Sequence, residues 1–180
     1  GFVHHSPLKD AFERIATSIA DSLDFLEGMS GRRVHEATHA GFFASHEGLV
    51  LHYEQAQARF IPRQTRWYDL STHMPWIGMR TAQLDGAHIE FFRGIANPIA
   101  VKIGPATSVE GLLELISVLS PDNEPGRLAL IHRFGARAIE SRLPPLVEAV
   151  ERAGRRVLWS CDPMHGNTET TPQGVKTLRV

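Results

Sequence analysis

The chain has 180 residues, of which 42% are apolar and 22% charged, and its formal net charge is −1. This composition is typical of a soluble globular protein with room for one domain and its core. The small net charge and the scattered basic residues exclude an overall electrostatic field that would attract nucleic acid or an anionic membrane. No apolar stretch is long enough to span a bilayer. The single cysteine, Cys161, excludes an intrachain disulfide, and we expect a reducing, cytoplasmic location.

The first part of the chain predicts helical elements joined by polar loops. Apolar residues recur every three or four positions and predict an amphipathic lead-in helix over residues 7–27, with Ser6 as its N-cap. A polar loop should follow over residues 31–41. Residues 48–51 could form either a short strand or the start of a helix, because four residues are too few for periodicity to decide. Residues 53–60 are interpreted as a helix. The lead-in helix mixes charges of both signs on its polar face, which favours packing over membrane binding.

Strands and helices alternate through the rest of the chain. Short, nearly continuous apolar runs predict the strands, and amphipathic segments predict the helices. The strands are predicted at 76–78, 99–103, 128–131 and 157–160, and the helices between them at 81–93, 108–119 and 136–152. The last helix contains Pro144 and Pro145, which could interrupt it. This alternation predicts a parallel sheet that belongs to a larger barrel.

Polar side chains follow three of these predicted strands. Lys102 lies at the end of one, Arg133 follows the next, and Asp162 and His165 follow the last, beside a Gly-Asn turn. Active sites of alternating β/α folds lie at the carboxyl ends of their strands. The pattern therefore predicts one anion site with a metal-capable histidine beside it.

Each of these residues also has an ordinary structural interpretation. Lys102 could extend to solvent, and Arg133 could form a structural ion pair. A lone histidine such as His165 is more often hydrogen-bonded within the fold than a metal ligand. Arg80, taken alone, would be an ordinary residue at a helix start. Cys161 is interpreted as a buried small hydrophobe.

Six blocks of this sequence, spread over residues 42–177, carry a family resemblance. They are Ser45-His46-Glu47 with Tyr53-Glu54, Trp76 to Thr81, Gln83 to His88, Arg93 to Pro105, Leu128 to Gly135, and Cys161 to Thr168. In this order they closely resemble the class II, or plant-type, 3-deoxy-D-arabino-heptulosonate 7-phosphate synthases. The resemblance implies an α/β fold, a (β/α)8 TIM barrel. Residues 1–180 would supply a central portion of it, about five of eight strands, with no internal domain boundary.

The resemblance also implies a reaction. Members of this family are transferases that condense phosphoenolpyruvate with erythrose 4-phosphate, the first step of the shikimate pathway to chorismate and the aromatic amino acids. A divalent metal is implied, with manganese the first choice and cobalt, iron or zinc as alternatives. We expect a homo-oligomer when the protein is complete, with no nucleic-acid or membrane partner. The alternative is a non-catalytic remnant that binds a phosphorylated metabolite or a partner protein.

Site roles carry over by position. Arg80, Lys102 and Arg133 match the residues that bind phosphoenolpyruvate. His165 matches the one histidine among the metal ligands, and with Lys102 and Arg133 it forms the expected catalytic set. Three further residues are expected to line the site: Met79, Asp162 and Lys176.

Two departures accompany the resemblance. Relatives place an acidic residue where this chain has Met79, which puts one substrate or water contact in question. The family's metal cysteine and another substrate arginine would precede Gly1, and its acidic metal ligands would follow Val180. Cys161 is not expected to be the metal cysteine. We therefore expect these 180 residues alone to be inactive.

Overall fold

A computed structural model describes residues 9–31 and 41–178 of the chain. The chain forms two compact units, residues 1–42 and residues 43–180, and each is described by itself. The prediction that the whole chain is one segment without an internal boundary stays a prediction. None of the helices in the described ranges is long and apolar enough to cross a membrane.

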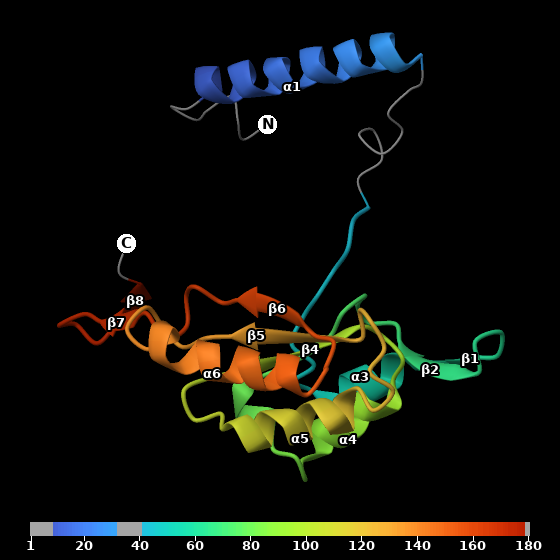
Figure 1. Cartoon of the computed structure of the whole chain (residues 1–180), viewed down its shortest axis with the longest axis vertical. Coiled ribbons are helices and arrows are strands. Elements are labelled where there is room, and N and C mark those ends of the chain that lie inside the picture. The colour runs from blue at the N-terminus through green and yellow to red at the C-terminus, as the bar shows by residue number, and fades with distance from the viewer. Residues whose placement is uncertain (1–8, 32–40, 179–180) are drawn as a thin grey trace. The chain divides into compact units, whose positions relative to one another are not determined.

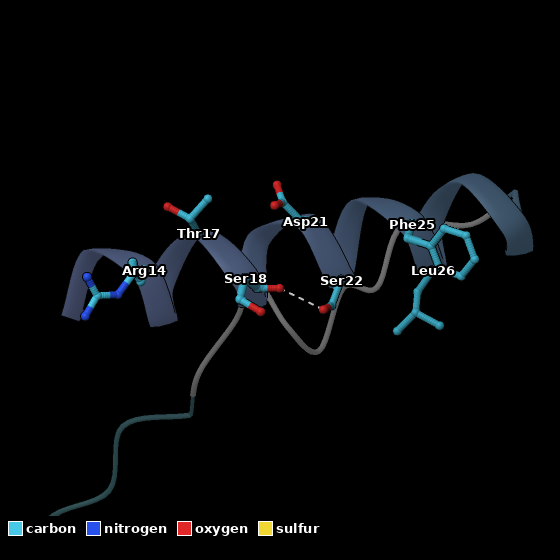
Figure 2. Close-up of a pocket in the computed structure, with 7 residues that line it drawn as sticks. All are labelled: Arg14, Thr17, Ser18, Asp21, Ser22, Phe25 and Leu26. Carbon is cyan, nitrogen blue, oxygen red and sulfur yellow. Dashed lines mark hydrogen bonds between the residues drawn. The ribbon is translucent and has the colours of Figure 1, made fainter. Parts of the chain in front are cut away.

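The first unit contains helix α1 (Lys9–Ser30), which confirms the predicted lead-in helix, although the proposed cap Ser6 lies outside the described residues. Figure 2 shows the stretch of α1 from Arg14 to Leu26, where the Ser22 hydroxyl donates to the Ser18 carbonyl oxygen at 2.7 Å. The side chains drawn there line a shallow hollow on the helix surface, and all of them come from this one helix. None of the helix's residues is buried within the described structure, so this surface has no enclosing walls and defines no site.

The second unit is built on a four-stranded parallel sheet (Figure 1). Its strands are β3 (Trp76–Ile77), β4 (Ile99–Ile103), β5 (Leu128–His132) and β6 (Leu158–Cys161), and they lie side by side in sequence order. Each predicted strand is therefore confirmed to within about one residue at its ends. A parallel bridge between Glu47 and Trp76 extends the pairing beyond β3. The described residues thus supply four parallel strands, with the bridge as a partial fifth, and the expected share of about five of eight barrel strands stays a prediction.

Three helices connect these strands and lie together on one side of the sheet (Figure 1). They are α4 (Ala87–Gly94), α5 (Val109–Leu119) and α6 (Ile139–Arg152). The main core lies between them and the sheet, where Val101 and Leu130 are fully buried. The sequence leaves Thr107 and Ser108 as alternative caps of α5. The structure has Ser108, whose hydroxyl accepts a hydrogen bond from the Gly111 N–H at 3.1 Å.

Two of the predicted helices differ from the structure, one in where it begins and one in its continuity. Helix α4 begins at Ala87 instead of residue 81, because the preceding residues form the 3-10 helix η2 (Met79–Thr81) and then a turn in which the Gly86 N–H donates to the Gln83 carbonyl oxygen. Helix α6 is not interrupted at Pro144 and Pro145; it runs through both, with their side chains exposed.

Two antiparallel hairpins were not predicted. Helix α3 (Leu51–Gln57) ends earlier than expected, and β1 (Ala58–Ile61) then pairs with β2 (Arg66–Asp69). The helix predicted through residue 60 is therefore wrong after Gln57, because the Phe60 and Trp67 rings pack across the hairpin with centroids 5.9 Å apart. Strands β7 (Thr168–Thr170) and β8 (Lys176–Leu178) form the second hairpin.

This topology agrees with the predicted fold class at a coarse level. The chain has mixed α/β architecture with a parallel sheet in sequence order and its crossover helices on one side. That is how consecutive β/α units are arranged in a (β/α)8 barrel. Closure into an eight-stranded barrel stays a prediction.

Candidate active site

A pocket of about 470 Å³ collects the predicted site residues of the second unit. Cavities of a few hundred Å³ are the usual size for small-molecule sites. Nine residues line it: Glu47, Trp76, Gly78, Met79, Arg80, Lys102, Arg133, His165 and Lys176. The pocket lies where the parallel strands end. Lys102, Arg133 and His165, which the strand-end pattern singled out, meet there with Arg80, which the family resemblance added.

Lys102 is held on the side of β4 away from the helices. Its strand neighbours Val101 and Ile103 are buried in the helix-side core, and alternation along the strand turns Lys102 to the other face. Its ammonium group lies 4.4 Å from the centroid of the Trp76 ring and 2.7 Å from the Asp162 carboxylate. Only 12% of the side chain is exposed, so the alternative that Lys102 extends freely to solvent is wrong.

Asp162 connects the lysine to the histidine. Its Oδ2 accepts from Lys102 Nζ and lies 2.7 Å from His165 Nδ1. Its Oδ1 accepts from the backbone N–H groups of Met164 and His165 at 3.1 and 3.0 Å. Burial by itself would raise the pKa of Asp162, but the hydrogen bonds from Lys102, His165 and the backbone outweigh it and hold that pKa well below its usual value. The carboxylate is therefore charged and fixed at neutral pH.

His165 is oriented by this carboxylate. Because Nδ1 lies against Asp162, the other ring nitrogen, Nε2, is the one left for a ligand. A carboxylate behind a histidine is a common arrangement at metal sites, so His165 fits the role of one metal ligand. The described residues contain no group of three or more His, Cys, Asp or Glu side chains arranged to hold a metal ion.

Arg133 reaches the pocket through a close contact between two loops. Gly135 and Gly166 both have positive φ angles, 76° and 93°, and a Cβ atom on either would overlap the backbone of the other. The Asn167 side-chain oxygen accepts from the Ala136 N–H at 2.7 Å across the same junction. This junction fixes the loop after β5 against the loop after β6, and so sets Arg133 beside His165.

The remaining cations come from short elements. Arg80 lies in η2, immediately after β3, and Lys176 is the first residue of β8. Both are exposed and both line the pocket. Lys176 is brought there by the β7–β8 hairpin, which the sequence pattern did not reveal.

One pocket residue was predicted from the sequence as site-lining and another was not. Met79 lines the pocket as predicted, with its thioether packed against Gly104. Glu47 also lines the pocket and was not among the predicted site residues. The signal that could have found it is its place in the Ser45-His46-Glu47 block.

Cys161 corrects one prediction. It ends β6 and is exposed, so the interpretation as a buried hydrophobe is wrong. The reason is its position in β6, where its neighbours Ser160 and Leu158 are exposed as well. It does not line the pocket formed by the described residues.

Taken together, the parallel sheet and the cations at its strand ends define an α/β protein with a cation-lined pocket beside a carboxylate-oriented histidine. The sequence profile of the Class-II DAHP synthetase family matches residues 1–180, so the chain belongs to this family.

Several curated relatives are similar to this chain in sequence. The chain is 46% identical to the phospho-2-dehydro-3-deoxyheptonate aldolase of Mycolicibacterium smegmatis, covering 98% of this chain and 39% of the relative. It is 47% identical to the enzyme of the same name from Streptomyces coelicolor, covering 99% and 39%. It is 44% identical to a probable chloroplastic enzyme of that name from Catharanthus roseus, covering 98% and 36%. The chain thus spans about two fifths of the length of these relatives.

Proposed function

We propose that this chain is part of a 3-deoxy-7-phosphoheptulonate synthase, which condenses phosphoenolpyruvate with erythrose 4-phosphate. The observation that carries the proposal is the convergence of Arg80, Lys102, Arg133 and His165 in one pocket. Membership of the Class-II DAHP synthetase family and the printed names of the relatives support it.

The cations of the pocket match the charges of phosphoenolpyruvate. This substrate carries a carboxylate and a phosphate, and a guanidinium group binds either through paired hydrogen bonds. Arg80 and Arg133 are assigned to these paired contacts. Lys102 serves as a compact point charge, held in place by the Trp76 ring and the Asp162 carboxylate.

The reaction requires the two substrates to be aligned. Phosphoenolpyruvate C3 bonds to the aldehyde carbon of the sugar, water adds at C2, and phosphate then leaves with cleavage of the C2–O bond. In this proposal Arg80, Lys102 and Arg133 hold phosphoenolpyruvate so that C3 faces the aldehyde. Lys176 lies at the same pocket and is assigned to the phosphate of the sugar.

His165 is proposed to hold a divalent metal through Nε2, and manganese is the first choice for a mixed ligand set, ahead of cobalt, iron or zinc. A bound divalent ion would supply Lewis-acid polarisation of the aldehyde. Asp162 keeps the His165 ring oriented for this role.

The proposal extends to the biological setting. The reaction would open the shikimate pathway to chorismate and the aromatic amino acids. We propose a cytoplasmic, homo-oligomeric enzyme with no nucleic-acid or membrane partner.

The second candidate, a non-catalytic remnant of the family, rests on Met79 in place of an acidic residue. It is not favoured, because a site without chemistry has no physical reason to bring four cations and an oriented histidine into one pocket.

Turnover by the complete enzyme tests the proposal. We expect phosphoenolpyruvate to be consumed only when erythrose 4-phosphate and a divalent metal are both present, with heptulosonate phosphate and inorganic phosphate formed in equal amounts. Rigorous chelation with EDTA should abolish turnover, and added manganese should restore it. Undiminished turnover after chelation would contradict the proposed role of the metal. Absence of any condensation would contradict the synthase assignment.

A further inference from the structure

One carboxylate in the pocket has no role in the proposed reaction so far. Glu47 is half-buried and lines the pocket with Arg80, Lys102 and Arg133. Among the nine residues lining the pocket in the described structure it is the sole carboxylate. Asp162, the nearby alternative, is already engaged by Lys102, His165 and two backbone N–H groups. No hydrogen bond or ion pair to the Glu47 carboxylate occurs among the described residues, which leaves its oxygens available to a ligand or water.

The backbone around Glu47 is firmly placed. The Trp76 N–H donates to the His46 carbonyl oxygen at 2.9 Å, and the Gly48 N–H donates to the Trp76 carbonyl oxygen at 3.0 Å. These two bonds align the segment with β3 in parallel. His46 Nε2 also lies 3.0 Å from the carboxylate of Glu54, which is only 2% exposed. The segment is therefore anchored on both sides of Glu47.

Gly78 makes the room that the Glu47 side chain uses. A Cβ atom on residue 78 would overlap one carboxylate oxygen of Glu47. The φ of Gly78 is −68°, so any residue type could adopt this backbone conformation. The absence of a side chain at residue 78 is thus what admits the Glu47 carboxylate to this place.

Residue 79, next to Gly78, carries no carboxylate in this chain. Met79, which stands where an acidic residue was expected, packs its thioether against Gly104 and offers the pocket no proton acceptor of comparable basicity. A condensation that adds water to C2 needs a group to take a proton from that water. We propose that Glu47 is this proton acceptor, an inference that rests on the synthase function proposed above.

Every proton that moves in this step can be followed. As the water oxygen bonds to C2, one water proton passes to a carboxylate oxygen of Glu47. That proton is then delivered to the alkoxide left on the former aldehyde carbon, so the carboxylate is regenerated. When the C2–O bond to phosphate breaks, the C2 hydroxyl proton leaves with the phosphate and C2 becomes the product ketone.

The test compares Glu47→Gln and Glu47→Asp in the complete enzyme. Glu47→Gln keeps the size of the side chain but removes the base, so kcat should fall about 100-fold or more, as for loss of a general base. The KM and the directly titrated Kd for phosphoenolpyruvate should change less than about threefold, since Glu47 is not assigned to binding that substrate. Glu47→Asp keeps a carboxylate and should retain at least about ten times the kcat of Glu47→Gln. Glu151→Gln, an exposed carboxylate on α6, is the matched control.

A second variant tests placement without touching Glu47. Gly78→Ala would push the end of the flexible Glu47 side chain away from the pocket wall, so kcat should fall while the melting temperature stays close to that of the unsubstituted enzyme. Gly94→Ala adds a methyl group where no atom lies within 4 Å and should leave kcat unchanged.

The outcomes separate the two proposals. If the unsubstituted enzyme turns over and Glu47→Gln keeps kcat within about threefold, or Glu47→Asp loses as much as Glu47→Gln, the role of Glu47 is overturned and the synthase function stands. If the unsubstituted enzyme forms no heptulosonate phosphate, the synthase function fails and takes the role of Glu47 with it.

Discussion

At the scale of single residues, Lys102 has the most informative environment in the pocket. It is flanked by an aromatic ring on one side and a charged carboxylate on the other. An ammonium group held this way pays little further conformational entropy when an anion arrives, because its rotamers are already restricted. The same contacts make it part of the local stability of the fold.

Replacing Lys102 tests both consequences. Lys102→Met should weaken phosphoenolpyruvate binding to the complete enzyme by about 1.5–3 kcal/mol, the size of a hydrogen bond to a charged group. It should also lower the melting temperature, because Asp162 would lose a charged partner in a site where its side chain is only 10% exposed. Calorimetric titration and thermal unfolding measure these effects, with Lys9→Met on α1 as the control. An unchanged affinity for phosphoenolpyruvate would show that Lys102 does not bind this substrate.

Asp162 gives a pH-dependent prediction. Its pKa in the folded protein lies well below the ordinary value of 3.8, so folding favours the charged form. The resulting stability is fully present above that ordinary pKa and is lost as the pH falls through it toward the folded value. Asp162→Asn should cost about 3 kcal/mol near neutral pH, the effect of removing one partner of a largely buried ion pair. The gap in unfolding free energy between the two proteins should narrow below about pH 4. A gap that stays constant down to pH 2 would contradict this account.

At the scale of elements, the junction between the loops after β5 and β6 decides how the site is assembled. Gly135 and Gly166 approach so closely that neither tolerates a Cβ atom, and both have backbone angles that disfavour other residues. The junction joins Arg133 to the segment that carries His165, so the two residues cannot move independently.

Gly166→Ala should therefore disturb both stability and substrate binding. The added methyl group meets the Gly135 backbone, and backbone cannot yield as a flexible side chain does. We expect a loss of about 2 kcal/mol or more in unfolding free energy and a clear rise in the KM for phosphoenolpyruvate. Gly126→Ala is the matched control, since Gly126 also has positive φ, 81°, but no atom within 4 Å of the added carbon. Equal losses in the two variants would show that backbone strain alone, and not the junction, is responsible.

The elements also show where sequence patterns succeed. Strands β4 and β5 were predictable because their apolar runs are buried on both faces, which few other local structures require. The hairpin of β1 and β2 was missed because residues 53–60 are too few to separate helical from strand periodicity. There the cross-strand contact between Phe60 and Trp67 decides the outcome, and no local pattern shows it.

At the scale of the whole molecule, the chain covers 36–39% of the length of three of its curated relatives. The described residues supply four parallel strands and one candidate metal ligand. A barrel active site draws its residues from the ends of several strands around the whole barrel. We therefore propose that the site described here is one part of a larger constellation.

This leads to a prediction about the isolated segment. A purified polypeptide of these 180 residues should form no heptulosonate phosphate above background, even with saturating substrates and manganese. The complete enzyme, assayed in parallel at the same molar concentration, is the control. Measurable synthesis by the segment alone would refute the view that further ligands are required.

The sequence by itself determined where the strands of the parallel sheet lie and that Lys102, Arg133 and His165 lie at or after their ends, because apolar runs and strand periodicity are local properties of the chain. Resemblance to a family added Arg80 and Lys176. Only the tertiary structure decided that Asp162 pairs with Lys102, 60 residues away, and that Glu47 enters the pocket over Gly78. The physical reason is that such contacts depend on strand register and on the space between loops, which arise when distant segments pack and leave no periodic trace in the sequence.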